Sequence, residues 1–489
     1  MSLASVRNPA NMPTTAARAA EQGALVQMQW LRNAAVRLAV GLGALASVWQ
    51  PAVAHANGNH AHSFISLHAL EHLPDGPLRD FLSDPALQKA LLNGTVFPDG
   101  GYAIGNGYGE TAHWEPYQRE LLAYVKARHP QLENDPAARE KLAFLFGMFS
   151  HGMADQTYDA LFMDAAKVHD QKGWKDELLT SFDTATDVFW CHNHGPSPVP
   201  ELWLPIDDIV AVYSARGEPV DAEIVQNGQL LLNTVVLNYP KATAQDEAKV
   251  SELKAMYPWG FEHLTDPHRP GSPLCEGKIV AAYWQSIWAE LHGAPPELRI
   301  LASVPTAGAS HPFVTKDDPE AKIAVIVSRG LSAKDLPADA LVARTADGQQ
   351  LPTKQNLFYG NASHVLRLLP QSDWPRDQAV TLHLKAGVVS YDGVALAAEE
   401  TLTVLFGQSN LQEPGQPPPH SPFQLRPGAD QSPDVIDPAD AQADVGTAPA
   451  KAAAKDSGCS AGGTAASPAG LVALTCAWIA LWLARRKIA

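Results

Sequence analysis

The stretch FLFGMFSHGMADQTYD, residues 144–159, is strongly apolar, yet it contains His151, Asp155 and Asp159. Residues four apart lie one above another on the same face of an α-helix. The three ionisable side chains therefore form one stripe on an otherwise apolar helix. A hydrogen-bonded core histidine or a solvated stripe would be ordinary explanations. Metal binding is the more specific one, because a His/Asp pair at this spacing offers two ligands to one ion.

Composition restricts the class of protein around this helix. The chain has 489 residues, of which 46% are hydrophobic, and a formal net charge of −16. This length accommodates two domains with tails. The negative charge and the lack of a basic run argue against a nucleic-acid partner held by attraction to phosphates.

Both ends of the chain have the composition of sorting segments. Residues 1–56 predict a signal peptide with a long polar start, since arginines precede an apolar run that ends in small residues. An N-terminal anchor helix is the alternative. Residues 469–489 combine an uncharged run with a terminal Arg-Arg-Lys, which predicts a transmembrane or sorting tail. We therefore expect export to the cell envelope or the extracellular space, with anchoring or cleavage of the tail left open, together with lipidation at Cys459.

The central part divides into three segments. Residues 57–296 show helical periodicity, and residues 297–410 contain short β-branched runs such as KIAVIVS and AVTLHLK. Residues 411–468 are rich in proline and alanine and predict a disordered linker. The expected fold class is multidomain, with an all-α domain, an Ig-like β-sandwich, a disordered stalk and a C-terminal membrane helix.

Other ligand-type residues occur within the helical segment. His62 opens the first predicted helix, Asp99 lies in VFPDGG, which we expect to form a loop, and His113 follows in GETAHWEPY. Loop residues would complete a coordination sphere begun by the helix of residues 144–159. Cys191 and Cys275 could form a disulfide in an oxidising compartment, and their spacing leaves this open.

The order of these motifs resembles the zinc-dependent phospholipase C superfamily, nearest the branch of glycosylphosphatidylinositol-specific phospholipase D. The resemblance covers residues of about 60–293 and not the β-sandwich. It is carried by His62 seven residues before Ala69-Leu70, by Gly94-Thr-Val-Phe-Pro-Asp99, by His113-Trp114, and by the helix Phe144 to Asp155.

The resemblance implies a site with two to three zinc ions. Asp99, His113, His151 and Asp155 would hold one ion, and His62 and Asp155 a second. Asp159, Asp183 and Asp187 match the third site, where the chain departs from the family because an aspartate stands in place of a histidine. Three carboxylates form a harder site than zinc prefers, so calcium, magnesium or no ion are the alternatives there. His192 and His194 follow closely and are either further ligands or loop histidines.

The resemblance further implies phosphodiester hydrolysis of a phospholipid at a membrane surface, of the phospholipase C or D type. Asp99 and Asp155 are the candidate catalytic residues, Asp99 as a ligand and orienting base and Asp155 as a ligand shared by two ions. A single-strand nuclease of the same superfamily and a surface-anchored binding protein with structural metals are the alternatives. The sequence does not indicate the head group or the oligomeric state.

Overall fold

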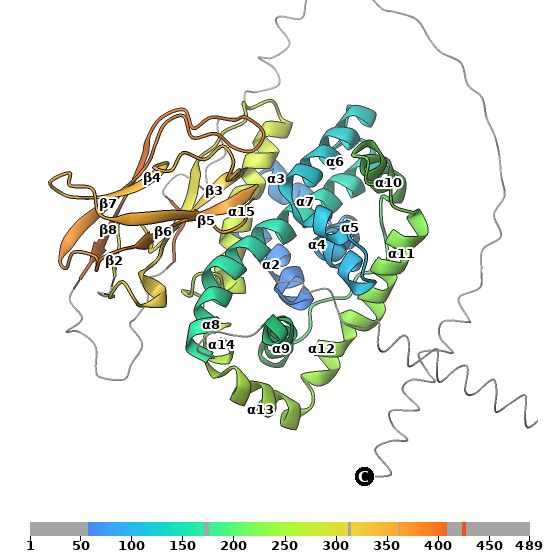
Figure 1. The fold of residues 1–489 in the computed structure, drawn as a ribbon. Helices are drawn as coiled ribbons and strands as arrows, with labels where there is room; N and C mark the ends of the chain where they lie inside the picture. The colour runs from blue at the N-terminus through green and yellow to red at the C-terminus, as the bar shows by residue number, and fades with distance from the viewer. Residues whose placement is uncertain (1–56, 171–175, 312–313, 361, 408–422, 427–489) are drawn as a thin grey trace, which may run out of the picture. The chain divides into compact units, whose positions relative to one another are not determined.

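The computed structural model describes residues 57–170, 176–311, 314–360, 362–407 and 423–426, which belong to one compact unit. The predicted signal peptide, nearly all of the predicted linker, and the predicted tail lie outside these residues. Among the described helices, none has both the length and the apolar character to cross a bilayer. About half of the described chain is helical, and two β-sheets follow the helices (Figure 1).

The helical part begins at Asn59 and ends at Leu291. Its elements are α2 (Asn59–His72), α3 (Pro77–Leu82), α4 (Gln88–Ala103), α5 (Tyr108–His113), α6 (Glu115–Arg128), α7 (Pro136–Thr157), the π-helix η2 (Tyr158–Met163), α8 (Asp164–Asp170), α9 (Asp176–His194), α10 (Ile206–Ala215), α11 (Ala222–Leu231), the π-helix η3 (Leu232–Val236), α12 (Asn238–Thr243), α13 (Glu247–Met256), α14 (Pro258–His263) and α15 (Pro273–Leu291).

Helix α7 is the centre of this part and contains the stretch of residues 144–159 up to Thr157. Asp135 caps its first turn by accepting a hydrogen bond from Ala137 N at 3.0 Å, and Pro136 occupies the first helical position. Every residue from Leu142 to Thr157 is buried, the polar His151 and Asp155 included, so this part of α7 lies in the protein interior. The helix packs against α2, α4, α5, α6 and α15 (Figure 1).

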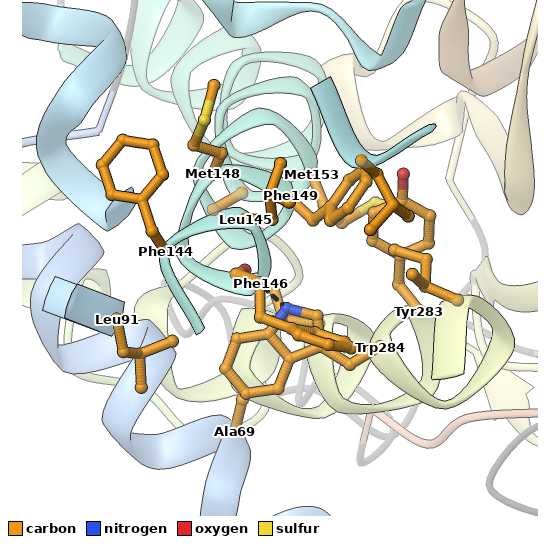
Figure 2. Packing of buried hydrophobic residues seen from close by; sticks show 14 of the residues in the cluster. Ala69, Leu91, Phe144, Leu145, Phe146, Met148, Phe149, Met153, Tyr283 and Trp284 are labelled. Atoms are coloured by element: carbon orange, nitrogen blue, oxygen red, sulfur yellow. Dashed lines mark hydrogen bonds between the residues drawn. The ribbon is translucent and has the colours of Figure 1, made fainter. Parts of the chain in front are cut away.

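Aromatic side chains fix α7 against α15. Figure 2 shows α7 side chains directed toward Leu91 on one side and toward Tyr283 and Trp284 on another. Trp284 Nε1 donates to the backbone oxygen of Phe146 at 2.8 Å, and the two rings meet edge to face at 5.9 Å. This hydrogen bond satisfies the indole N–H inside an apolar core. Helix α7 is therefore held against α15 by a directional hydrogen bond as well as by ring packing.

Two glycines bring α4 and α7 into backbone contact. A Cβ atom on Gly94 would lie 1.9 Å from the oxygen of Phe144, and one on Gly147 would lie 2.2 Å from the oxygen of Leu91. No side chain fits at these distances. Asp99 and His151 are therefore carried by two helices that cross closely.

The prediction that Asp99 lies in a loop is wrong. Asp99 is on α4, which continues through Pro98 to Ala103, and His113 is the last residue of α5. A proline inside a helix and two following glycines usually end it. Here Gly101 lies against the backbone of Gly109, where a Cβ atom would be 2.3 Å from Gly109 N. Close packing of α4 on α5 thus outweighs the local preference for a turn.

The strands form two four-stranded sheets. Their elements are β1 (Ile300–Val304), β2 (Ser310–His311), the 3₁₀ turn η4 (Pro319–Ala321), β3 (Ile323–Leu331), β4 (Leu341–Thr345), β5 (Thr353–Leu357), β6 (Ser363–Pro370), β7 (Gln378–Leu384) and β8 (Glu400–Phe406). One sheet has the order β1-β3-β6-β5 and the other β2-β8-β7-β4. All pairs are antiparallel except the short β2 with β8.

The two sheets share one apolar core, so a β-sandwich follows the helices as expected. Alternate residues such as Val325 of β3, Leu382 of β7 and Val404 of β8 meet in this core. Phe423, inside the predicted linker, is buried, and Arg426 N donates to the oxygen of Leu301 at 2.9 Å. The chain therefore contacts the sandwich again beyond the predicted boundary at residue 410, because burial of the Phe423 ring stabilises this contact.

The sandwich also packs on the helices. Ala324 and Ile326 of β3 and Val365 of β6 belong to the same apolar cluster as residues of α7 and α15.

The spacing of Cys191 and Cys275 left open whether they form a disulfide. In the structure both cysteines are free and buried.

Candidate metal centre

Five of the predicted ligands converge from four helices. His62 lies on α2, Asp99 on α4, His113 on α5, and His151 and Asp155 on α7. Ligand atoms of His62, His151 and Asp155 all lie within 4.8 Å of one another, and so do those of Asp99, His113 and His151. All five residues are buried, with exposures of at most 7%. The described residues thus contain two adjacent groups that could hold a metal ion.

Asp155 stands between the two groups. Its Oδ1 lies 2.8 Å from His62 Nε2, and its Oδ2 lies 3.1 Å from His151 Nε2 and 3.5 Å from His113 Nε2. Asp99 Oδ1 lies 3.3 Å from His113 Nε2 and 4.0 Å from His151 Nε2. One carboxylate therefore presents one oxygen to each side, the arrangement needed for a ligand shared by two ions.

Backbone carbonyls determine which imidazole nitrogen faces the centre. His151 Nδ1 lies 2.7 Å from the oxygen of Thr95, and His113 Nδ1 lies 2.6 Å from the oxygen of Gly109. A carbonyl oxygen only accepts, so each Nδ1 carries a proton, and Nε2 is the nitrogen that has the lone pair when the ring is neutral. Metal-binding histidines are usually oriented in this way.

The atoms that face one another lack hydrogen bonds. Six of the buried atoms without a hydrogen-bond partner in the described residues lie at this centre: Nε2 of His62, His113 and His151, Oδ1 of Asp99, and both carboxylate oxygens of Asp155. Buried polar atoms are nearly always paired, because an unpaired one costs about 1–3 kcal/mol. A cation is the partner that would satisfy nitrogen lone pairs and carboxylate oxygens together, so the donor set fits a metal.

The electrostatics agree with this fit. Burial opposes the charge of Asp155, but His151 and His62 outweigh it and hold the pKa of this carboxyl well below its ordinary value. Burial lowers the pKa of His151. Burial also opposes protonation of His113, yet the adjacent carboxylates of Asp99 and Asp155 raise its pKa to about 9. A bound cation would displace that proton, so metal binding releases it.

Asp159 lies apart from the two groups and has another partner. It is the second residue of the π-helical turn η2, and its Oδ2 accepts a hydrogen bond from the hydroxyl of Tyr359, beyond the end of β5. Burial and the charge of Asp155 raise the pKa of Asp159 to about 7. Asp155 is thus close enough to act on Asp159, although Asp159 belongs to neither group of ligands.

Asp187 caps a helix. Its Oδ1 accepts from His60 N at 2.8 Å and from Ala61 N at 3.1 Å, in the first turn of α2. Gly58 leaves room for it, since a Cβ atom there would lie 2.3 Å from Asp187 Cγ. Asp183 lies one turn before Asp187 on α9. The structure therefore joins Asp187 to α2 and Asp159 to the sandwich.

The neighbouring histidines of α9 lie elsewhere. His192 and His194 are on the last turn of α9 and not in a loop. His194 stacks on Trp190 with ring centroids 4.2 Å apart, and His192 Nδ1 is 3.4 Å from the oxygen of Ala244. Neither belongs to the two ligand groups.

Sequence reasoning missed Glu276 and Tyr359. Glu276 on α15 is fully buried and accepts from Thr157 Oγ1 and Asn57 Nδ2, both at 2.9 Å. Burial raises its pKa well above the ordinary value, as do the charges of Asp155 and Asp159. The signal for Glu276 was an acid near the start of an apolar helix. No local signal marks Tyr359, because its place depends on how the sandwich packs.

Comparison with known proteins places the chain in no family. No family model matches it, and no curated protein does. Among solved structures, S-layer protein rSbsC(31-844) matches at 10% identity and TM-score 0.19 over 61% of this chain and 46% of the other, so the match spans under half of that protein. The N-terminal part of the bacterial S-layer protein SbsC matches at 9% identity and TM-score 0.19, over 61% and 78% of the two chains. Similarity at this level supports no conclusion about fold or function.

Proposed function

We propose that the chain is an exported, metal-dependent phosphodiesterase that hydrolyses phospholipids, with a helical domain of the zinc-dependent phospholipase C type and an Ig-like sandwich. The observation that carries the proposal is Asp155, whose two oxygens face different histidines in a buried centre without hydrogen-bond partners. A carboxylate shared in this way favours a pair of ions over a single structural one.

The ligands divide between two positions. Asp99, His113, His151 and Asp155 would hold one zinc ion, and His62 and Asp155 the second. Bound zinc supplies Lewis acidity and lowers the pKa of a coordinated water toward ~7. Two protein ligands at the second position leave places for water and substrate, whereas structural zinc is closed by four protein ligands.

The chain's own residues contribute position and a fixed electrostatic field. The carbonyls of Thr95 and Gly109 hold the imidazoles with Nε2 toward the centre. Asp99 is the candidate for an orienting base, because Oδ1 lies next to His113 Nε2 at 3.3 Å and has no hydrogen bond in the described structure. Groups fixed in this way need no rearrangement as charge develops on a phosphate.

The substrate class rests on the predicted export signal and on the motif order. An exported enzyme meets phospholipid at a membrane surface, and the net charge of −16 disfavours a nucleic acid. We propose a cell-envelope or extracellular location on the same grounds.

The test is metal analysis of purified protein combined with hydrolysis of a panel of phospholipid head groups. We expect two ions per chain and release of a phosphorylated head group or of the free head group. Asp155→Asn should lose both ions and turnover, whereas Asp335→Asn, at an exposed site in the sandwich, should retain them. Cleavage of single-stranded DNA without lipid hydrolysis would identify a nuclease. Two ions without turnover of either substrate would identify a binding protein with structural metals.

A further inference from the structure

The sandwich makes two hydrogen bonds to the end of α7 and to η2, which follows it. Tyr359 donates its hydroxyl to Asp159, and His364 N donates to Gln156 Oε1 at 2.7 Å. Gln156 is adjacent to Asp155 in the chain and is 1% exposed. The segment from the end of β5 to the start of β6 therefore lies against the end of α7 and the start of η2, directly after the ligands.

Tyr359 is held firmly in this place. Its ring meets Trp114, the neighbour of His113, at 4.8 Å and Phe358 at 4.7 Å. Phe358 N donates to the oxygen of Val365 at 3.1 Å, which continues the pairing of β5 with β6. The hydroxyl is thus positioned by a sheet and an aromatic contact, and not by a free side chain.

Asp159 and Asp187, two of the acids that would hold a third ion, each have one carboxylate oxygen engaged, and neither belongs to a group of described residues that could hold a metal ion. Asp159 accepts from Tyr359, and one oxygen of Asp187 accepts two backbone N–H groups of α2. Releasing Asp187 would uncap the helix that carries His62. A third ion would also need Asp159 to give up its tyrosine. The residues present therefore do not fit the third zinc site that the resemblance implies.

We propose that the hydroxyl of Tyr359 takes the place at Asp159 that a third ion takes in the family the chain resembles. The centre then holds two ions, and the sandwich supplies a hydrogen-bond donor to Asp159 beside it. Tyr359 is a positioning residue that acts through Asp159. This inference rests on the proposed function only in assuming that the other two positions bind metal.

Metal counting is the first test. Wild-type protein dialysed against excess zinc should contain two ions per chain by mass spectrometry of the metal. Asp159→Asn should also contain two, whereas Asp155→Asn should contain fewer. Three ions in the wild type and two in Asp159→Asn would overturn the inference, because Asp159 would then be a ligand.

The second test observes the tyrosine directly, by NMR of protein labelled with ¹³C at the tyrosine Cζ. The signal missing from Tyr359→Phe identifies Tyr359. We expect that signal to shift in Asp159→Asn in both the zinc-loaded and the chelated protein. A shift in the chelated protein alone would mean that metal displaces the hydroxyl, and would overturn the inference.

Neither readout requires turnover, so the two proposals fail separately. Two ions with the tyrosine in contact but no phosphodiester cleaved would remove the proposed function and leave this inference in place. Near-UV circular dichroism of Tyr359→Phe provides the folding control, with the exposed Tyr239→Phe as the matched variant.

Discussion

His151 serves both ligand groups and is fully buried, so its removal should have the largest effect of any single histidine. We expect His151→Ala to lose metal and to lower turnover by more than the ~10–100-fold typical when a residue that only orients a ligand is removed. The measurement is metal content with initial rates on phospholipid. His192→Ala, on α9, should leave both unchanged, and retention of full activity by His151→Ala would refute the assignment.

Glu276 allows a test based on protonation. Its raised pKa keeps the carboxyl neutral in the folded chain, whereas the unfolded chain releases the proton above the ordinary value of 4.5. Folded stability should therefore fall as pH rises above that value. Glu276→Gln cannot ionise, so its stability relative to wild type should increase from pH 5 to pH 8.

Urea unfolding of the chelated proteins measures this difference, because metal is then absent from both. The exposed Glu252→Gln serves as the control. A difference between Glu276→Gln and wild type that does not change with pH would contradict the prediction.

The polar spacing on one helix and the motif order anticipated which five residues meet. They did not anticipate the partner of Asp159, since a helix pattern carries no information on what packs against its end. The π-helical turn after Thr157 also changes the phase of the stripe that residues 144–159 suggest.

At the scale of elements, the crossing of α4 and α7 is the most sensitive feature. Gly94→Ala or Gly147→Ala should force the helices apart, because the added methyl would meet backbone atoms at about 2 Å. We expect a loss of at least ~1–3 kcal/mol in stability, the usual cost of overpacking, together with weaker metal binding as Asp99 moves away from His151.

Gly107→Ala is the matched control, since a Cβ atom there meets nothing within 4 Å and its φ is −66°. Thermal unfolding and zinc affinity check both variants. Unchanged zinc affinity in Gly94→Ala would show that the crossing does not position the centre.

The same crossing explains why VFPDGG misled the sequence prediction. Proline and paired glycine are local signals for a turn, but the glycines here serve close contact between helices. Such contacts are tertiary, and a single sequence does not report them.

At the scale of the whole molecule, Glu115 connects the helices to the sandwich. It lies 2.5 Å from Arg119 Nε, and it accepts from Tyr283 Oη at 3.0 Å and from Gly330 N on β3 at 2.8 Å. Burial opposes its charge, but Arg119 and His364 hold its pKa well below the ordinary 4.5. The negative charge therefore stabilises the fold above pH 4.5, and this contribution is lost as pH falls through the lowered pKa.

Glu115→Gln should destabilise the protein at pH 7 by about 3–5 kcal/mol, as expected when a buried pair loses one partner. The difference from wild type should shrink as pH falls below 4.5. Chemical unfolding at pH 7, 5 and 3 tests this, and a constant difference across the series would contradict it.

This connection lay beyond sequence prediction. The helical pattern, the β-branched runs and their order indicated helices followed by a sandwich, and each segment could be recognised from its own periodicity. The contact of Gly330 with Glu115 depends on how the helices and the sandwich are placed relative to each other. Neither the helical nor the strand periodicity carries information on that placement.

The hydrogen bond between Tyr359 and Asp159 joins residues 200 positions apart. At synthesis rates of about 5–20 residues per second, Tyr359 is added roughly 10–40 s after Asp159. During that interval the growing chain already contains every histidine of the centre, but Asp159 has no tyrosine partner. Asp159 therefore obtains its hydrogen-bond partner only when the sandwich is complete, well after the ligand-bearing helices have been synthesised.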